Sequence, residues 1–201
     1  MNKDIIYIFL MVNEYITKTQ LQIMYLGVSL ASCVCVMTNS YIIICSNIVG
    51  CMCLVDLFFI KKTDMLIHHI SVLGLIHYLN THSDIEIIND SIPIALSTEI
   101  STIFLTLNNL LENSSAVIIK KINKIAFVST FFYYRIYNYL YYVVLNKDIN
   151  DAFYNHSKNN FEYCQIYIGQ YVLFILNLYW SSLIFKKIIF NNNYIKSGEN
   201  V

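Results

Sequence analysis

The sequence has little charge and almost no proline. Only 13% of its 201 residues are charged and 57% are hydrophobic, whereas about a quarter of an ordinary soluble domain is charged. These proportions exclude a typical soluble protein and indicate a polytopic membrane protein. With one proline, no internal repeat and no long linker, the chain is expected to form a single domain. Its formal net charge of zero gives no electrostatic basis for binding nucleic acid.

Paired CxxC motifs are also absent, which removes the usual sequence signature of a zinc site. The six cysteines lie within or beside apolar stretches, and two pairs among them are spaced CxC. Residues two apart on a helix point to different sides. We therefore expect the cysteines to be small buried hydrophobic residues rather than disulfides or ligands: Cys33, Cys35, Cys45, Cys51, Cys53 and Cys164.

The chain does contain a series of apolar stretches, most of them close to the roughly 20 residues needed to cross a bilayer as a helix. They predict an all-α integral membrane fold, a bundle of six transmembrane helices within residues 21–190. The N-terminal segment 1–20 is expected to hold an interfacial helix, because its apolar run is short for a signal peptide and no small-residue cleavage site follows. Residues 191–201 are expected to form a cytoplasmic tail. The predicted spans are 21–38, 41–60, 65–80, 91–110, 125–145 and 163–185.

The loops between the predicted spans alternate in charge. Every second loop is rich in lysine, and the intervening loops are uncharged, acidic or mixed. The positive-inside rule places the basic loops, and with them both termini, in the cytoplasm. The lysines concerned are Lys3, Lys18, Lys61, Lys62, Lys120, Lys121, Lys124, Lys186, Lys187 and Lys196.

Five ionisable side chains nevertheless fall inside predicted spans: Asp56, His68, His69, Glu99 and Arg135. A charged residue at the centre of a transmembrane helix costs about 2.5–3.5 kcal/mol, which offsets the gain from roughly five or more apolar residues. Such groups normally face the interior of the bundle, pair with one another and mark a functional site.

Arg135 is the only arginine and lies in the middle of the fifth predicted span. It needs an anionic partner, for which Glu99, Asp56 or the phosphate of a lipid or thioester donor are candidates. The alternative is a purely structural ion pair with Glu99. At α-helical spacing, three further residues would share its face: Asn138, Tyr139 and Tyr142.

Glu99 begins a polar stripe in the fourth predicted span, where Thr102, Thr106 and Asn109 follow at helical spacing. Hydroxyl groups in such a stripe can also serve only to hold neighbouring helices together. That alternative explains the threonines but not the carboxylate.

Asp64 precedes His68 by four residues, so its carboxylate can orient the imidazole and raise its basicity. His69 points about 100° further round the helix and could face a second wall of the same cavity. With Asp56 at the end of the preceding span, these four residues are interpreted as candidate catalytic groups. Metal binding is the alternative, but adjacent helical residues diverge and no HxxxH pair is present.

In order and spacing, these residues resemble the TLC family of multipass membrane proteins. The matching segments, over roughly residues 20–190, are VDLFFI with Asp56, Asp64 followed by the His68–His69 pair, TEISTIFLTLNN with Glu99, and FFYYRI with Arg135. The resemblance implies a six-helix bundle around a central lipid-accessible cavity, in the endoplasmic reticulum or a related membrane. In the ceramide synthases of this family, paired histidines serve acyl transfer from acyl-CoA to a sphingoid amine.

The chain departs from those synthases at two places. A threonine that follows the synthase histidines by three positions is Val72 here, and the synthase motif H-D-x-x-D falls on residues 98–102, where only the acid Glu99 remains. The chain therefore resembles the TLC-domain-containing branch rather than a true ceramide synthase. Carried over by position, the resemblance implies His68 or His69 as general base or acyl-accepting nucleophile, oriented by an aspartate. Lipid or anion binding is expected of Glu99, Thr102, Arg135 and Asn138.

Three functional hypotheses follow. The preferred one is a multipass protein of lipid homeostasis, acting on sphingolipid or phospholipid acyl chains, with membrane lipids as partners. If it is an enzyme, the expected reaction is N-acyl transfer, with acyl-CoA as co-substrate and no metal or other cofactor. The second hypothesis is a non-catalytic lipid-binding or cargo-escort protein. The third is a proton-coupled transporter that uses Asp56, Glu99 and the histidines as a relay.

Overall fold

The computed structural model describes residues 18–198, and every regular element among them is a helix. The predicted all-α class is therefore confirmed for this part of the chain. Most of the predicted N-terminal segment 1–20 lies outside the described residues. In chain order the helices are α2 (Lys18–Thr38), α3 (Ile42–Asp56), α4 (Thr63–Thr81), α5 (Glu86–Ser97), α6 (Glu99–Leu110), α7 (Val117–Thr130), the π-helical segments η1 (Phe131–Asn138) and η2 (Leu140–Val144), α8 (Lys147–His156) and α9 (Asn160–Gly198).

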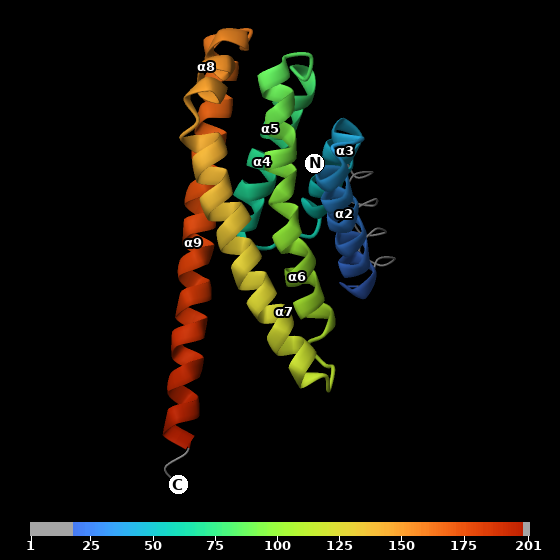
Figure 1. Ribbon diagram of the computed structural model, residues 1–201, viewed down its shortest axis with the longest axis vertical. Helices are drawn as coiled ribbons and strands as arrows, with labels where there is room; N and C mark the ends of the chain where they lie inside the picture. Colours follow the sequence, from blue (N-terminus) through green and yellow to red (C-terminus); the bar gives the residue numbers. More distant parts are fainter. Residues whose placement is uncertain (1–17, 199–201) are drawn as a thin grey trace, which may run out of the picture.

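The helices form an elongated bundle (Figure 1). α2 packs against α6 and, through a tight hairpin, against α3, while α4 packs against both α3 and α9. The α4–α5 turn and α8 lie at one end of the bundle, and the α6–α7 turn and the end of α9 lie at the other. The α3–α4 turn, in contrast, lies at mid-height, so the start of α4 is placed near the middle of the molecule.

Each predicted span contains a helical segment, but the span 41–60 is helical only from Ile42 to Asp56. The spans 21–38 and 163–185 lie within α2 and α9, while 91–110 and 125–145 are each divided between shorter helices. In the described part of the chain, two stretches are long and apolar enough to cross a membrane by length and composition, Thr19–Thr38 and Asn160–Ile188, and α3 is a shorter apolar helix. The number of crossings and the cytoplasmic termini stay predictions.

The break between α5 and α6 falls at Thr98. Pro93 lies inside α5 and has no N–H for the helical ladder. At the junction the hydroxyl groups of Ser97 and Thr98 donate to backbone carbonyls three residues earlier, at 2.6 and 2.7 Å. These side chains compete with backbone N–H groups for the same carbonyls. The break places Glu99 in the first turn of α6.

The segment that carries Arg135 is π-helical from Phe131 to Val144, interrupted only at Tyr139. A π-helix bonds each N–H to the carbonyl five residues back, so its turn is wider than an α-helical turn. Residues three, four and seven positions after Arg135 therefore need not lie on the same face of the helix as the arginine, although α-helical spacing predicted that they would. Tyr139 is buried with 3% of its surface exposed, but Tyr142 is 42% exposed, and its predicted place beside the arginine is wrong.

A disulfide between Cys35 and Cys45 links the end of α2 to the start of α3. The prediction that no cysteine forms a disulfide is wrong for this pair. It considered only neighbours on one helix, whereas the turn around Asn39 and Tyr41, both with positive φ, folds α3 back against α2. The free cysteines are Cys33, Cys51, Cys53 and Cys164, of which Cys51 and Cys164 are exposed rather than buried.

Candidate functional site

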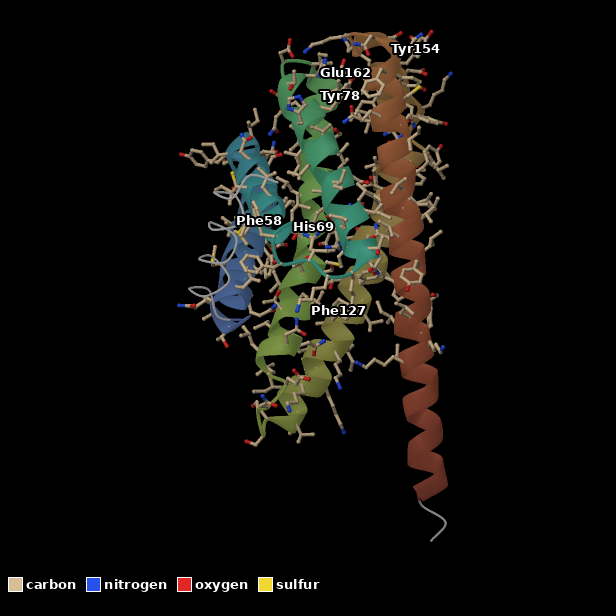
Figure 2. All side chains as sticks on the ribbon, turned by 180° about the vertical axis from the view of Figure 1, so that it is seen from behind. Phe58, His69, Tyr78, Phe127, Tyr154 and Glu162 are labelled. Carbon is tan, nitrogen blue, oxygen red and sulfur yellow. A yellow bond between two sulfur atoms is a disulfide. The ribbon has the colours of Figure 1, made fainter. Side chains whose placement is uncertain are left out.

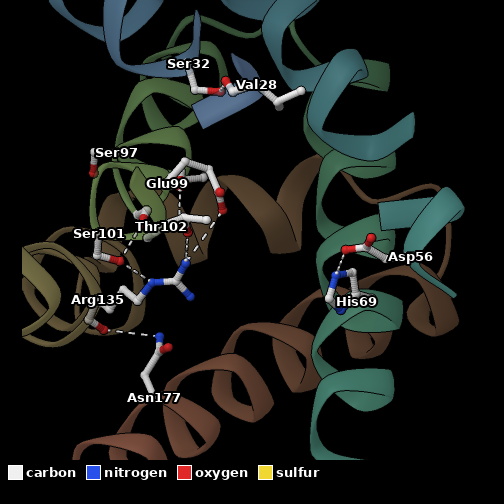
Figure 3. A network of polar contacts seen from close by, with 12 residues as sticks. Val28, Ser32, Asp56, His69, Ser97, Glu99, Ser101, Thr102, Arg135 and Asn177 are labelled. Carbon is white, nitrogen blue, oxygen red and sulfur yellow. Dashed lines mark hydrogen bonds and ion pairs between the residues drawn. The ribbon is translucent and has the colours of Figure 1, made fainter. Parts of the chain in front are cut away.

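Asp56 and His69 form a buried pair about halfway along the bundle, at the end of α3 and in the second turn of α4 (Figures 2 and 3). Only 4% and 6% of their surfaces are exposed. His69 Nε2 lies 2.8 Å from Asp56 Oδ2. The other ring nitrogen, Nδ1, lies 2.8 Å from the backbone carbonyl oxygen of Met65, one turn earlier. The imidazole is therefore fixed at both nitrogens.

These two contacts determine the charge of the pair. The carbonyl of Met65 can only accept a hydrogen bond, so Nδ1 of His69 carries a proton and donates it. The contact between Nε2 and the Asp56 carboxyl group needs one further proton. Whether that proton sits on the imidazole or on the acid, the two side chains together carry no net charge. A neutral unit is compatible with this degree of burial.

Arg135 is anchored on the first turn of α6 (Figure 3). Its Nε donates to Ser101 Oγ at 2.7 Å, and its Nη2 donates to Thr102 Oγ1 at 2.8 Å. The same Nη2 lies 3.7 Å from Glu99 Oε1, which provides the compensating negative charge. The arginine is 8% exposed, so an anion in this position is needed to offset the cost of burying the guanidinium.

Two asparagines support the same region. Asn177 on α9 donates through Nδ2 to the backbone carbonyl of Arg135 at 3.2 Å. Asn138 donates through Nδ2 to Ser97 Oγ at 3.4 Å, which ties η1 to the end of α5. The π-helical segment is therefore bonded to α9 at Arg135 itself and to α5 at Asn138, three residues later.

A cavity of about 50 Å³ lies beside these groups. Most of its wall is apolar, and we call its six polar side chains the polar region. The apolar wall is formed by Val49, Val72, Leu75, Ile76, Leu79, Ile92, Ala95, Leu96, Tyr139 and Leu173, and the polar region by Ser46, His68, Thr98, Glu99, Arg135 and Asn177. This combination of an apolar wall with a few convergent polar groups is typical of a small-molecule site.

Two side chains in the cavity wall have a buried polar atom without a hydrogen-bond partner in the described part of the chain. These atoms are Nδ1 of His68 and Oδ1 of Asn177. The His68 ring is held edge-on against Trp180 and His69, with ring centroids 5.1 and 5.4 Å apart. An unpaired buried polar atom costs about 1–3 kcal/mol. Both atoms therefore mark a place where a bound molecule could form hydrogen bonds.

Asp64 does not contact His68 directly. Its Oδ2 accepts a hydrogen bond from the indole N–H of Trp180 at 2.9 Å, and the Trp180 ring in turn packs against His68. The prediction that Asp64 orients this histidine is wrong as a direct contact, because α9 brings the indole N–H of Trp180 to the carboxylate instead. The indole N–H also holds the pKa of Asp64 below its ordinary value, so this group is ionised at neutral pH.

The structure brings together three of the predicted site residues at the cavity: His68, Glu99 and Arg135. The other predicted residues surround them in the contacts described above: Asp56, Asp64, His69, Thr102 and Asn138. In the part of the chain that the structure describes, no three His, Cys, Asp or Glu side chains are grouped as a metal site.

Sequence reasoning missed Ser101, Asn177 and Trp180. Trp180 is the only tryptophan of the chain, and Asn177 lies three residues before it in an otherwise apolar stretch. Polar atoms at this spacing on one face of a long apolar helix were a signal that could have been used. Ser101 gave no such signal, because serine is common between membrane helices.

The arrangement combines an unpaired imidazole, a compensated guanidinium and an apolar wall. A neutral imidazole can donate or accept one hydrogen bond at Nδ1, and it can take up a proton from a reacting group. The apolar wall offers a dry surface to a hydrocarbon chain. These properties suit a molecule with one small polar group and a long apolar part.

Comparison with known proteins identifies the family of the chain. A model of the TLC domain matches residues 6–186. Neither the curated proteins nor the solved structures yield a match. Because the matched region covers most of the 201 residues, the chain belongs to the TLC-domain family, whose members are membrane proteins associated with lipid metabolism.

Proposed function

We propose that this protein binds a membrane lipid in the cavity and acts in the homeostasis of lipid acyl chains. The observation that carries the proposal is the cavity itself, whose wall is apolar except for six polar side chains, among them His68, Glu99 and Arg135. The polar head of the lipid binds at these three side chains, and its acyl chain lies along the apolar wall of α4 and α5. The six spans, the cytoplasmic termini and a location in the endoplasmic reticulum belong to the same proposal.

The proposal is tested by filling the cavity. Ala95 lies in the apolar wall, so Ala95→Trp should occupy the space of the acyl chain. Lipids that co-purify with the full chain in a mild detergent are measured by native mass spectrometry. Wild type is expected to retain a lipid, and Ala95→Trp to lose most of it.

The control is Ile119→Trp, which places the same ring on an exposed position of α7. This variant should retain lipid as wild type does. Size-exclusion profiles show whether each variant is folded. A folded Ala95→Trp that keeps the wild-type amount of lipid would refute binding in the cavity.

N-acyl transfer is the second candidate function, and the unpaired Nδ1 of His68 in the cavity wall favours it. An amine nitrogen attacks the thioester carbonyl of acyl-CoA, the new C–N bond forms and the C–S bond breaks. His68 takes the proton from the amine and returns it to the departing CoA thiolate, which leaves as the thiol. The amide product and free CoA account for all atoms.

Acyl transfer is tested with His68→Ala in microsomes, using labelled acyl-CoA and a sphingoid amine. Loss of a general base typically lowers the rate roughly 10²–10⁴-fold. His77→Ala is the matched control, because His77 is an exposed histidine outside the cavity on the same helix. Absence of transfer in wild type and control alike would leave the non-catalytic lipid-binding protein as the function.

A further inference from the structure

The charged groups at the polar region of the cavity cancel one another. The Asp56–His69 pair carries no net charge, because its two contacts fix the number of protons that it holds. The guanidinium of Arg135 is compensated by the carboxylate of Glu99 at 3.7 Å. With a neutral His68, the region as a whole has a net charge of zero.

The other charged side chains of the neighbouring elements do not change this sum. Residues 19–55 and 163–185, which include most of α2, α3 and α9, contain no Asp, Glu, Lys or Arg. Asp64 at the start of α4 is bonded to the indole of α9 and does not line the cavity. Glu86 and Asp90 on α5 are exposed. Among the residues that the structure describes, a ligand with a net charge would therefore find no uncompensated partner of opposite sign in the cavity wall.

The unpaired atoms of the wall indicate what a ligand must offer instead. Nδ2 of Asn177 donates to the carbonyl of Arg135, which fixes the orientation of the amide. Its Oδ1 is therefore the atom without a partner among the described residues, and it can only accept a hydrogen bond. A hydroxyl group or an amide N–H can supply the donor, and an ionised phosphodiester or carboxylate cannot. A hydroxyl can also bond to the free nitrogen of His68.

We infer that the cavity selects lipids whose head is uncharged and carries a hydroxyl or amide N–H, in preference to phosphate-bearing lipids. The inference rests on the proposed lipid binding and specifies its ligand class. An uncharged head with a hydroxyl group can form hydrogen bonds with the unpaired atoms of His68 and Asn177, and it leaves both ion pairs intact. A phosphate would have to compete with Glu99 for Arg135, because among the described residues Arg135 is the one Lys or Arg side chain in the cavity wall.

Three lipids that share a glycerol backbone and one oleoyl chain provide the test. They are 1-oleoylglycerol, 1-oleoylglycerol-3-phosphate and 1-oleoylglycero-3-phosphocholine, with an uncharged, an anionic and a zwitterionic head. The full chain, purified in a nonionic detergent, is titrated with each lipid in competition with radiolabelled 1-oleoylglycerol. Wild type should bind 1-oleoylglycerol about tenfold more tightly than either phosphate-bearing lipid.

Glu99→Gln supplies the decisive comparison, because it keeps the size of the side chain and leaves Arg135 without its anion. This variant should lower the preference for 1-oleoylglycerol over 1-oleoylglycerol-3-phosphate by about tenfold. Glu112→Gln is the matched control, since it removes a carboxylate in the exposed turn after α6 and should leave the preference unchanged.

The results separate this inference from the function on which it rests. A wild-type protein that binds either phosphate-bearing lipid at least as tightly as 1-oleoylglycerol overturns the inference, whether or not Glu99→Gln folds. So does a folded Glu99→Gln that shifts the preference less than about threefold. Binding of none of the three lipids overturns the proposed lipid binding itself, and the inference with it.

Discussion

At the scale of single residues, charge compensation explains why ionisable groups are tolerated in an apolar bundle. Asp56 is matched by His69 and Arg135 by Glu99, and each pair is further bonded to a carbonyl or to hydroxyl groups. Such pairs add little net stability compared with apolar residues, but breaking one leaves a buried charge. Replacing one member of a pair should therefore lower the stability of the fold strongly, whereas replacing both members should lower it only a little.

Arg135→Met should destabilise the protein by about 3 kcal/mol, because it leaves the Glu99 carboxylate without a cation. For a domain of this size the melting temperature would fall by roughly 6–12 °C. Adding Glu99→Gln to Arg135→Met should restore at least half of the loss. Melting of purified protein in detergent measures both changes.

Lys124→Met is the control for the loss of a positive charge, since Lys124 is exposed on α7. It should leave the melting temperature within about 2 °C of wild type. If Arg135→Met behaved like this control, the ion pair would have no structural role.

At the scale of elements, contacts between helices far apart in the sequence hold the polar region together. α9 contributes two of them, from Asn177 to the backbone of η1 and from Trp180 to Asp64 on α4. The junction at Thr98 and the π-helical turn set which side chains of α6 and η1 meet. The position of each polar group thus depends on an irregularity or an inter-helix bond rather than on helical spacing alone.

Trp180→Phe should weaken the α4–α9 contact, because the ring remains but its N–H donor is lost. The expected loss is about 1 kcal/mol, or roughly 2–4 °C in melting temperature. In an Asp64→Ala background the same substitution should have almost no further effect. Equal effects of Trp180→Phe in both backgrounds would show that the hydrogen bond contributes nothing.

The pH dependence of this contact follows from the pKa of Asp64, which the indole N–H lowers. A lowered pKa means that the fold favours the ionised form. The stabilisation is present above the ordinary aspartate pKa of about 4 and is lost as the pH falls through the lower value in the fold. The difference in melting temperature between wild type and Trp180→Phe should therefore be the same at about pH 6 and about pH 8.

The α2–α3 hairpin should carry one disulfide in the purified protein. Of the six cysteines, Cys35 and Cys45 are bonded and four are free. Denaturation without reductant followed by N-ethylmaleimide should add four adducts to the intact mass, and prior reduction should raise the number to six. Cys35→Ser with Cys45→Ser should give four adducts under both conditions, and six adducts in unreduced wild type would contradict the bond.

At the scale of the whole molecule, the sequence predicted the helical class and where the helical segments fall, because apolar stretches of membrane length are a strong signal. It also indicated that ionisable residues in these stretches would pair, because charge is costly there, and the structure pairs Asp56 with His69 and Glu99 with Arg135. It did not predict their partners. Asp56 meets His69 and Asp64 meets Trp180 only because of how α3, α4 and α9 pack, and no spacing along one helix contains that information. The disulfide was missed for the same reason.

The two ends of the molecule should face opposite sides of the membrane. The α6–α7 turn and the end of α9 both lie toward one end of the bundle (Figure 1). Lysines follow that turn in α7 at positions 120, 121 and 124, and two more lie in the last third of α9 at positions 186 and 187. The α4–α5 turn at the opposite end is flanked by Asp84 and Glu86. The positive-inside rule then places the first end in the cytoplasm and the second across the membrane.

Protease protection in sealed microsomes tests this orientation with two epitope tags, one after Val201 and one after Asp84. External protease should remove the C-terminal tag from intact vesicles and leave the tag at Asp84 until detergent is added. Digestion of the Asp84 tag in intact vesicles, with protection of the C-terminal one, would mean that the molecule is inserted the other way round. Digestion of both tags would place both positions on the cytosolic side, which requires an even number of crossings between them. The six-span bundle needs three, at 91–110, 125–145 and 163–185, so that result would exclude it.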